Sequence, residues 1–226
     1  MHFNKLIRLP GTNSWCAATV CLAAVALLAA CNSSAVVSVN KSEPSIQKHA
    51  YDKDNRPPKE VGKHPSVEAN THWDYRIVPE ITVDRKKLET NAQGFQATVI
   101  VKSISVELSL PIEMWVPEGV SERVIAHEEG HIRICKHFYA DAEKVALECA
   151  KSTIGHTFEG AGKDENEATQ RAIEFAGSEL CACYQRKIIA PTNRASATYD
   201  RLTSHGQNST PIEEAVDKAI DSAFAN

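Results

Sequence analysis

The sequence of 226 residues contains no basic patch, no internal repeat and no apolar run long enough to cross a bilayer. Lysines and arginines are interspersed with acidic residues and the net charge is −4, which argues against a nucleic-acid partner. Without a repeat, we expect one ordinary domain. The longest apolar run, residues 16–30, is shorter than the roughly 20 residues that a spanning helix needs.

That apolar run has the features of an export signal over residues 1–30. Lys5 and Arg8 precede it, and it ends in Leu28-Ala29-Ala30-Cys31 before a polar segment. The ending resembles the lipobox of bacterial lipoproteins, which implies that Cys31 is lipidated and becomes the N-terminus. A plain signal peptide or an uncleaved anchor is the alternative. Removing residues 1–30 would lower the net charge from −4 to about −6.

The lipobox resemblance also carries an expectation about location. Asn32 rather than Asp follows the cysteine, which implies transfer to the outer membrane, facing the periplasm of the bacterial cell envelope. Residues 31–71 are polar and contain Pro57, Pro58 and Pro65, so we expect a flexible, lipid-anchored tether. Residues 72–226 are then enough for a single folded domain.

The first part of that domain has the composition of β-strands. Four segments are rich in β-branched and aromatic residues: 75–78, 81–83, 95–101 and 104–110. Apolar residues occupy odd positions up to Val101 and even positions from Ile104. This change of parity predicts a bulge or tight turn near Lys102-Ser103.

The second part has the periodicity and caps of helices. A first helix is expected to begin at Ser121 or Glu118 and to run to about Lys151. Asp164 and Glu167 form a capping pair for a second helix over about 165–188. A last helix is expected over about 211–224. The predicted fold is therefore α+β: a small antiparallel sheet packed on an antiparallel helix hairpin, plus a C-terminal helix.

The motif H-E-x-x-H lies on the first expected helix, at His127-Glu128-Glu129-Gly130-His131. Only about 0.03 such matches are expected by chance in this composition. Two histidines four residues apart on a helix can both reach one Zn²⁺ ion, and Glu128 can then take a proton from water at the metal. Apolar residues recur on the same side, so the pair should face the interior. Ordinary hydrogen-bonded core histidines are the alternative.

Cysteine spacing gives a prediction about how the hairpin folds. Cys135 and Cys149 lie about 21 Å apart along one helix, too far for a disulfide between them. A hairpin folded near residue 158 places Cys135 opposite Cys181, so we predict that pair, with Cys183 as a substitute for Cys181. Cys149 is then free, or paired with Cys183 if the first helix ends early. Metal binding by these cysteines is disfavoured, because C-A-C lacks the usual two-residue gap.

A catalytic zinc site needs a third protein ligand, and several candidates fit poorly. His137 has the metzincin spacing, but Ile134 stands where that class needs a glycine. His156 is expected in the far loop of the hairpin, too distant from His131. Four glutamates on the second helix look like solvated charges: Glu165, Glu167, Glu174 and Glu179.

A better candidate lies in the segment Tyr199-Asp200-Arg201-Leu202-Thr203-Ser204-His205-Gly206. Together with Leu110-Pro111 and Trp115 before the H-E-x-x-H motif, this segment resembles the bacterial family of predicted secreted zinc-dependent proteases, long carried as a domain of unknown function. The resemblance implies that His205 is the third metal ligand. It also allows Tyr199 to donate to the oxyanion and Asp200 to orient a ligand imidazole. A surface-loop histidine is the alternative for His205.

These features predict a lipid-anchored zinc metallopeptidase that hydrolyses a peptide or protein substrate with a metal-activated water. Its site would combine Zn²⁺ on His127, His131 and His205 with Glu128 as base and Tyr199 as a further catalytic group. The alternative is a non-catalytic zinc-binding periplasmic lipoprotein that acts in binding or envelope assembly. A scaffold without metal is a third possibility.

Overall fold

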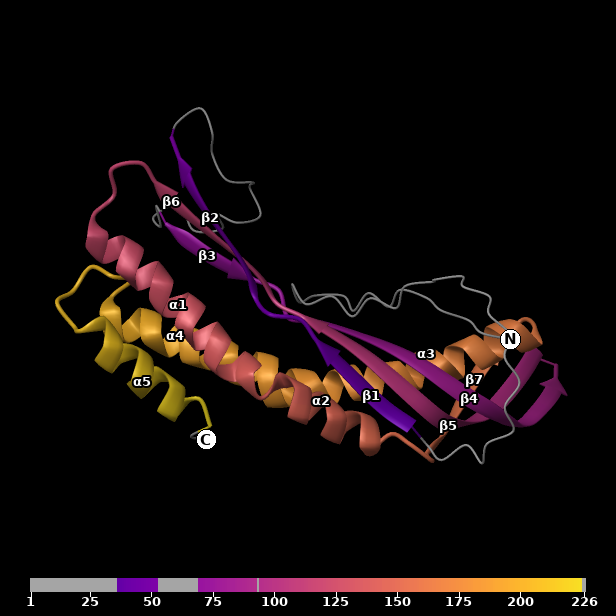
Figure 1. Ribbon diagram of the computed structural model, residues 1–226. Helices are drawn as coiled ribbons and strands as arrows, with labels where there is room; N and C mark the ends of the chain where they lie inside the picture. Colours follow the sequence, from indigo (N-terminus) through magenta and orange to yellow (C-terminus); the bar gives the residue numbers. More distant parts are fainter. Residues whose placement is uncertain (1–35, 53–68, 93, 225–226) are drawn as a thin grey trace. The chain divides into compact units, whose positions relative to one another are not determined.

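The computed structural model describes residues 36–52, 69–92 and 94–224, which form two compact units (Figure 1). Both units combine strands and helices, so the predicted α+β class is confirmed. The export signal and Cys31 lie outside the described residues. Within the described ranges, no helix is both long and apolar enough to span a membrane.

The first unit comprises residues 36–41, 76–108 and 143–185. Its elements are β1 (Val36–Lys41), β4 (Arg76–Asn91), β5 (Gly94–Ser109), α2 (Ala142–Lys151), β7 (Thr157–Gly162) and α3 (Glu165–Tyr184). The strand order is β1-β5-β4, and β7 also pairs with β5. Because β1 is parallel to β5 and β7 is antiparallel to it, the sheet is mixed rather than antiparallel as predicted.

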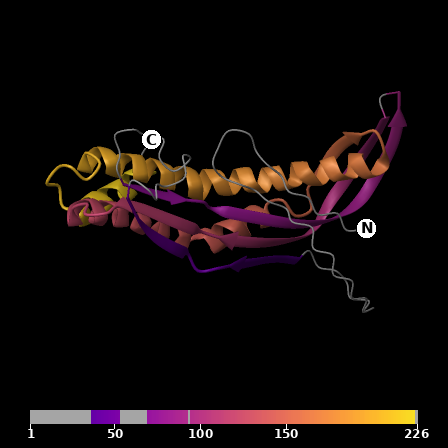
Figure 2. The same cartoon turned by 90° about the horizontal axis from the view of Figure 1, so that it is seen from above.

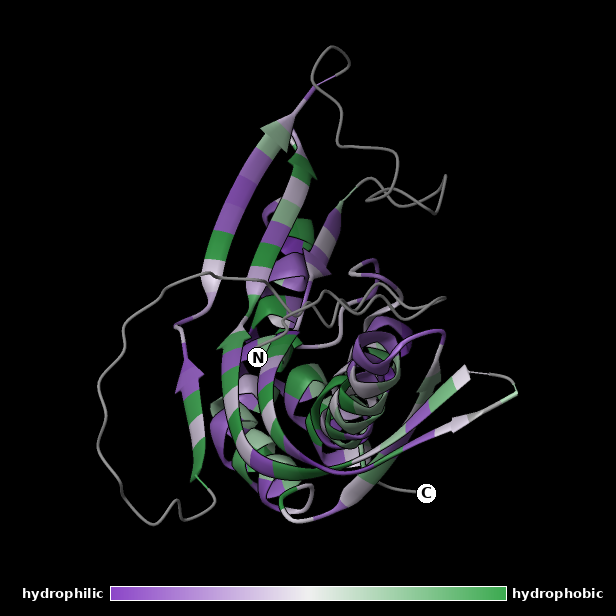
Figure 3. Ribbon diagram, turned by 90° about the vertical axis from the view of Figure 1, so that its right-hand side faces the viewer, coloured by the Kyte–Doolittle hydropathy of each residue, from purple (hydrophilic) through white to green (hydrophobic). Residues whose placement is uncertain are grey.

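The buried face of β5 shifts where the parity changes, but the strand runs unbroken from Gly94 to Ser109, so no tight turn lies at Lys102-Ser103. Val99 and Val101 are buried before it, and Ile104 and Val106 are buried after it. The change coincides with a change of partner, because β7 pairs with residues 95–100 and β1 with residues 103–108. Strands in this structure alternate between hydrophobic and hydrophilic residues, as one-sided burial requires (Figure 3).

The second unit comprises the described residues of 42–75, with 109–142 and 186–224. Its strands are β2 (Ser45–Tyr51), β3 (Asn70–Trp73) and β6 (Pro111–Pro117), in the order β2-β6-β3. Its helices are α1 (Glu122–Ala140), α4 (Ala190–Thr203) and α5 (Ile212–Ser222), which lie side by side in both views (Figures 1 and 2). Strand β2 is parallel to β6 and β3 is antiparallel to it, so this sheet is also mixed.

The expected tether is partly folded, and the single expected domain is two units. Strands β1, β2 and part of β3 fall within residues 31–71, which were predicted to be flexible; residues 53–68 lie outside the described part of the chain. Alternate residues of β1 and β2 remain exposed, so these strands need few apolar residues. Their partners β5 and β6 lie far along the chain, and a local composition argument cannot see such pairing.

The helices differ from the prediction at two ends. The first helix stops at Ala140 and a new one starts at Ala142. The second stops at Tyr184, and a π-helical turn, Gln185–Ile189, leads into α4, which the sequence analysis missed. Pro191 stands in the first turn of α4, where its missing N–H breaks no intrahelical hydrogen bond. Capping at Ser121 and Asp164 is confirmed, as is the C-terminal helix α5.

The predicted Cys135–Cys181 disulfide is wrong. Cys149 is bonded to Cys183, with their Cα atoms 5.8 Å apart, while Cys135 is a free, buried thiol. Two features explain the difference: the first helix ends early, and β7 occupies the connection that was expected to be a simple loop. The chain therefore folds back later than residue 158.

Candidate metal centre

Helix α1 brings the H-E-x-x-H motif into the interior of the second unit. Ser121 caps the helix, and its side chain accepts a hydrogen bond from the backbone N–H of Val124. His127, Glu128 and His131 are only 3%, 3% and 6% exposed. Three buried polar side chains on one helix face need partners, and α4 and β3 provide them.

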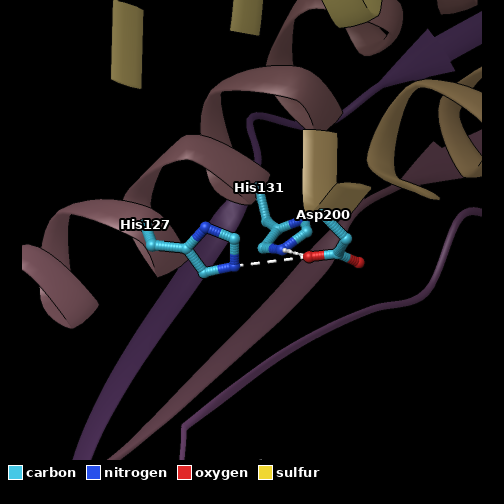
Figure 4. A group of neighbouring side chains, drawn as sticks. All are labelled: His127, His131 and Asp200. Atoms are coloured by element: carbon cyan, nitrogen blue, oxygen red, sulfur yellow. Dashed lines mark hydrogen bonds and ion pairs between the residues drawn. The ribbon is translucent and has the colours of Figure 1, made fainter. Parts of the chain in front are cut away.

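The third group is Asp200, which projects from α4 toward both imidazoles (Figure 4). Asp200 Oδ1 lies 3.3 Å from His127 Nε2 and 3.1 Å from His131 Nε2. Ligand atoms that surround an ion tetrahedrally at about 2.0–2.1 Å are separated from one another by about 3.3–3.4 Å. The two separations from Asp200 Oδ1 are thus close to that spacing, and all three ligand atoms lie within 4.8 Å of one another, so they form a group that could hold a metal ion.

Hydrogen bonds from α4 fix how the imidazoles are oriented. Thr203 Oγ1 donates to the carbonyl of Tyr199 over 2.8 Å and lies 3.2 Å from His127 Nδ1, so its lone pair can accept the Nδ1 proton. Ser196 Oγ lies 2.8 Å from Nδ1 of His131. When Nδ1 of a neutral imidazole carries the proton, Nε2 has a free lone pair. That tautomer can bind a metal through Nε2.

Either protons on the Nε2 atoms or a metal ion can lie between these imidazoles and Asp200. With Nδ1 protonated, a neutral His127 would present a lone pair to the Asp200 carboxylate, which repels it unless a proton or a metal ion lies between them. Without a metal, when Nε2 protons are donated to Asp200, burial alone would raise the pKa of Asp200, but these hydrogen bonds with His127 and His131 outweigh burial and hold that pKa well below its usual range. Asp200 is therefore a carboxylate and can serve as an anionic ligand.

Four residues on one face of α4 contact the α1 motif: Ser196, Tyr199, Asp200 and Thr203. Their spacing of three, four and seven residues from Ser196 places them on the same side of a helix. One helix thus carries two imidazoles, and the other carries a carboxylate and the groups that orient those imidazoles.

Tyr199 is held in a packing position beside the motif. Its side chain is fully buried, and its hydroxyl donates to the carbonyl of His127 over 3.1 Å. Its ring stacks on the His127 ring at 4.8 Å. Burial raises the pKa of the hydroxyl, and the nearby Glu128 and Asp200 raise it further. The buried hydroxyl is therefore already engaged with the helix that carries the motif, and the predicted oxyanion role of Tyr199 would require that hydrogen bond to break.

Gly130 inside the motif allows this packing. A Cβ built at Gly130 would lie 2.2 Å from the Tyr199 hydroxyl oxygen, far inside van der Waals contact. The tyrosine therefore passes directly over the helix backbone between the two histidines. A side chain at position 130 would push α4 and its Asp200 away from α1.

Glu128 has a partner that the sequence analysis missed. Thr71 Oγ1, on strand β3, lies 2.7 Å from Glu128 Oε2 and 3.2 Å from the Glu128 carbonyl oxygen, and both residues are buried. Trp73, on the same strand, stacks on His131 at 5.9 Å. No signal in the sequence pointed to Thr71, because it belonged to the expected tether.

His205 is near the group but is not part of it. Its Nδ1 lies 3.5 Å from Asp200 Oδ1, and its side chain is 59% exposed. The atoms that lie within 4.8 Å of one another come from His127, His131 and Asp200. The structure thus groups Asp200, and not the predicted third ligand His205, with the two motif histidines. Helix α4 ends at Thr203, so Asp200 faces α1 from within the helix and His205 follows its end.

Comparison with known proteins provides no assignment for this site. The chain matches no family model, no curated protein and no solved structure. The resemblance to the predicted secreted zinc-dependent proteases therefore stays a prediction that rests on the two motifs. What the site can do must be inferred from its own geometry.

Proposed function

We propose that this protein is a zinc-dependent peptidase whose metal ligands are His127, His131 and Asp200. The observation that carries the proposal is the convergence of these three ligand atoms beside the buried carboxylate of Glu128. Two neutral imidazoles and one carboxylate would leave a Zn²⁺ ion with a net charge of about +1 and an open position. Bound there, zinc would act as a Lewis acid on a carbonyl and acidify water.

Glu128 supports hydrolysis over other metal chemistry. Two histidines and one carboxylate can also bind iron in oxygenases, so the donor set alone does not select a reaction. A glutamate that directly follows the first ligand histidine is placed to accept a proton from attacking water and to return it to the leaving amine. Thr71 holds that carboxylate in one position.

The sheet beside the site favours an extended peptide as substrate. In the sheet order β2-β6-β3, strand β3 is at one end, and Thr71 and Trp73 on it contact Glu128 and His131. The backbone of such an edge strand can form ladder hydrogen bonds with an extended peptide. A peptide bound in this way would lie beside the proposed base.

The metal and the activity can be tested together. The purified protein should bind about one Zn²⁺ per chain, measured by elemental analysis, and should cut an unfolded protein such as casein. Glu128→Gln should retain the metal and lose cutting, whereas Asp200→Ala should lose the metal. A carefully loaded protein without zinc would refute the proposal. Bound zinc without cutting would favour the non-catalytic alternative in binding or envelope assembly.

We further propose that the chain is exported and held at the outer membrane by lipidated Cys31, facing the periplasm. The apolar run that ends in Leu28-Ala29-Ala30-Cys31 supports this proposal. Bacteria that express the chain should incorporate labelled palmitate into it, and Cys31→Ser should abolish the label. Equal labelling of both forms would refute lipidation at Cys31.

A further inference from the structure

His205 has an unusual backbone beside the proposed metal centre. Among the described residues, Ser204 and His205 are the non-glycine residues with positive φ, at 48° and 54°, and Gly206 follows at 77°. L-residues adopt this left-handed conformation rarely, and when they do the surrounding structure enforces it. Ser204 caps α4, but His205 needs a separate explanation.

Contacts from α1 and the following loop hold this conformation. Arg123 donates from Nε to the Gly206 carbonyl over 3.1 Å and from Nη2 to the Thr210 carbonyl over 3.0 Å. The His205 backbone N–H donates to the carbonyl of Asp200 over 3.0 Å. A Cβ at Gly206 would lie 2.9 Å from His127 Cβ, so the segment is seated directly on a ligand residue. These contacts therefore fix the backbone of His205, and its side chain extends into solvent beside Asp200.

The exposure of the residues shows from which side a substrate can arrive. His127 and His131 are buried, whereas the Asp200 side chain is 27% exposed and the His205 side chain 59% exposed. Two other polar groups are already engaged, since the Tyr199 hydroxyl donates to a backbone carbonyl and the Thr71 hydroxyl contacts Glu128. A molecule that reaches the centre from solvent past Asp200 thus meets His205.

We propose that His205 is a catalytic residue that contacts the substrate and is not a metal ligand. This inference rests on the proposed function. Imidazole carries at least one N–H in its neutral and protonated forms, so it can donate a hydrogen bond to an anionic oxygen. That oxygen is the substrate carbonyl oxygen, which gains negative charge as water attacks. A donor fixed in advance at this point stabilises the transition state more than the bound peptide.

The variants are chosen to keep the backbone intact. Glycine accepts positive φ freely, so His205→Gly removes only the side chain, and His205→Asn restores an N–H donor on a residue that tolerates the left-handed region. Loss of an oxyanion donor should lower kcat by about 10²–10³-fold. We expect this loss in His205→Gly with KM, zinc content and melting temperature almost unchanged, and partial recovery in His205→Asn. His137→Ala, which removes an exposed histidine on α1, is the matched control.

A binding measurement without turnover gives a second readout. Acetohydroxamic acid, titrated into the cobalt-substituted protein and followed by visible absorption, places an anionic oxygen at the metal. Its dissociation constant should rise at least about tenfold in His205→Gly and not in His137→Ala.

The outcomes separate this inference from the proposed function. If His205→Gly loses its zinc, His205 is a ligand and the inference is overturned. If His205→Gly leaves both kcat and hydroxamate affinity unchanged, His205 does not contact the substrate oxygen and the inference is also overturned. If the wild-type protein binds zinc, and binds hydroxamate in a manner that depends on His205, but cuts no peptide, then the contact by His205 is supported and the proposed peptidase activity is refuted. A wild-type protein that binds no metal overturns both.

Discussion

The hydroxyl of Thr71 lies 2.7 Å from the carboxylate of Glu128, although the two residues are 57 positions apart in the chain. Both side chains are buried, so the carboxylate has little water to hydrogen-bond. A buried acceptor of this kind needs a donor, which also holds it in one orientation. Thr71 thereby connects the edge strand β3 to the proposed base.

Replacing Thr71 should impair the proposed base without affecting the metal ligands. Thr71→Val keeps the shape but removes the donor, which should lower the free energy of unfolding by about 1–3 kcal/mol. We expect kcat to fall about tenfold with KM and zinc content unchanged. Thr71→Ser retains the hydroxyl and should retain most of the activity. Steady-state kinetics measure the fall in kcat, and urea unfolding measures the loss of stability. An equal loss of activity in Thr71→Val and Thr71→Ser would contradict the role of the hydroxyl.

Removing the metal should destabilise the wild-type protein but not a variant that lacks the Asp200 carboxylate. Ligand binding to the folded state alone stabilises by RT ln(1 + [L]/Kd), about 4 kcal/mol when free zinc exceeds Kd by 1,000-fold. A chelator should therefore lower the melting temperature measured by calorimetry. Asp200→Ala should melt at the same temperature with and without chelator, whereas Asp221→Ala, an exposed acid on α5, should behave like wild type. A wild-type melting temperature indifferent to chelator would contradict a metal in this group.

Tyr199→Phe should separate a packing role from an oxyanion role. The phenylalanine keeps the ring on His127 but leaves the His127 carbonyl without the 3.1 Å hydrogen bond. Loss of a buried hydrogen bond costs about 1–2 kcal/mol of stability. We expect urea unfolding to show that loss while kcat at saturating zinc stays within about threefold. A fall of 10²-fold or more would instead support the oxyanion role that the resemblance implied.

Gly130→Ala should disrupt the contact between α1 and α4. The added methyl group would meet the Tyr199 hydroxyl oxygen at 2.2 Å, and the tyrosine has no free space because it is fully buried. Overpacking of this kind costs about 1–3 kcal/mol or more. Zinc affinity should also fall, because Asp200 directly follows Tyr199 on α4 and would be displaced with it. Because alanine is otherwise more favourable than glycine inside a helix by about 1 kcal/mol, a loss of stability in Gly130→Ala reports the clash with Tyr199.

Cysteine chemistry should distinguish the observed pairing from the predicted one. Cys135 is buried and burial raises its pKa well above the usual range, so it should stay thiol and resist iodoacetamide in the folded protein even near pH 9. Denaturant should make it reactive. Peptide mapping should find Cys149 linked to Cys183, and Cys149→Ser should cost about 3–4 kcal/mol for the lost 34-residue loop. A Cys135–Cys181 peptide would contradict the structure.

Local structural features were predicted correctly from the sequence. The spacing of His127 and His131 placed both imidazoles on one helix face, and the change of parity after Val101 marked where burial shifts in β5. Caps at Ser121 and Asp164 followed from residue types at a helix start. Each of these features depends on neighbours within a few positions, so the geometry of one helix or strand suffices to predict it.

Features that join distant segments were decided only by the tertiary structure. Thr71 reaches Glu128 because β3 pairs with β6, and Asp200 lies beside both motif histidines because α4 continues to Thr203. The disulfide shows the same dependence on tertiary structure, because Cys149 pairs with Cys183 across a connection that contains β7, where the sequence analysis expected a loop. The sequence alone could identify the motif, but the position at which the chain folds back depends on β7 and the π-helical turn. Those elements are stabilised by their packing partners rather than by local propensity.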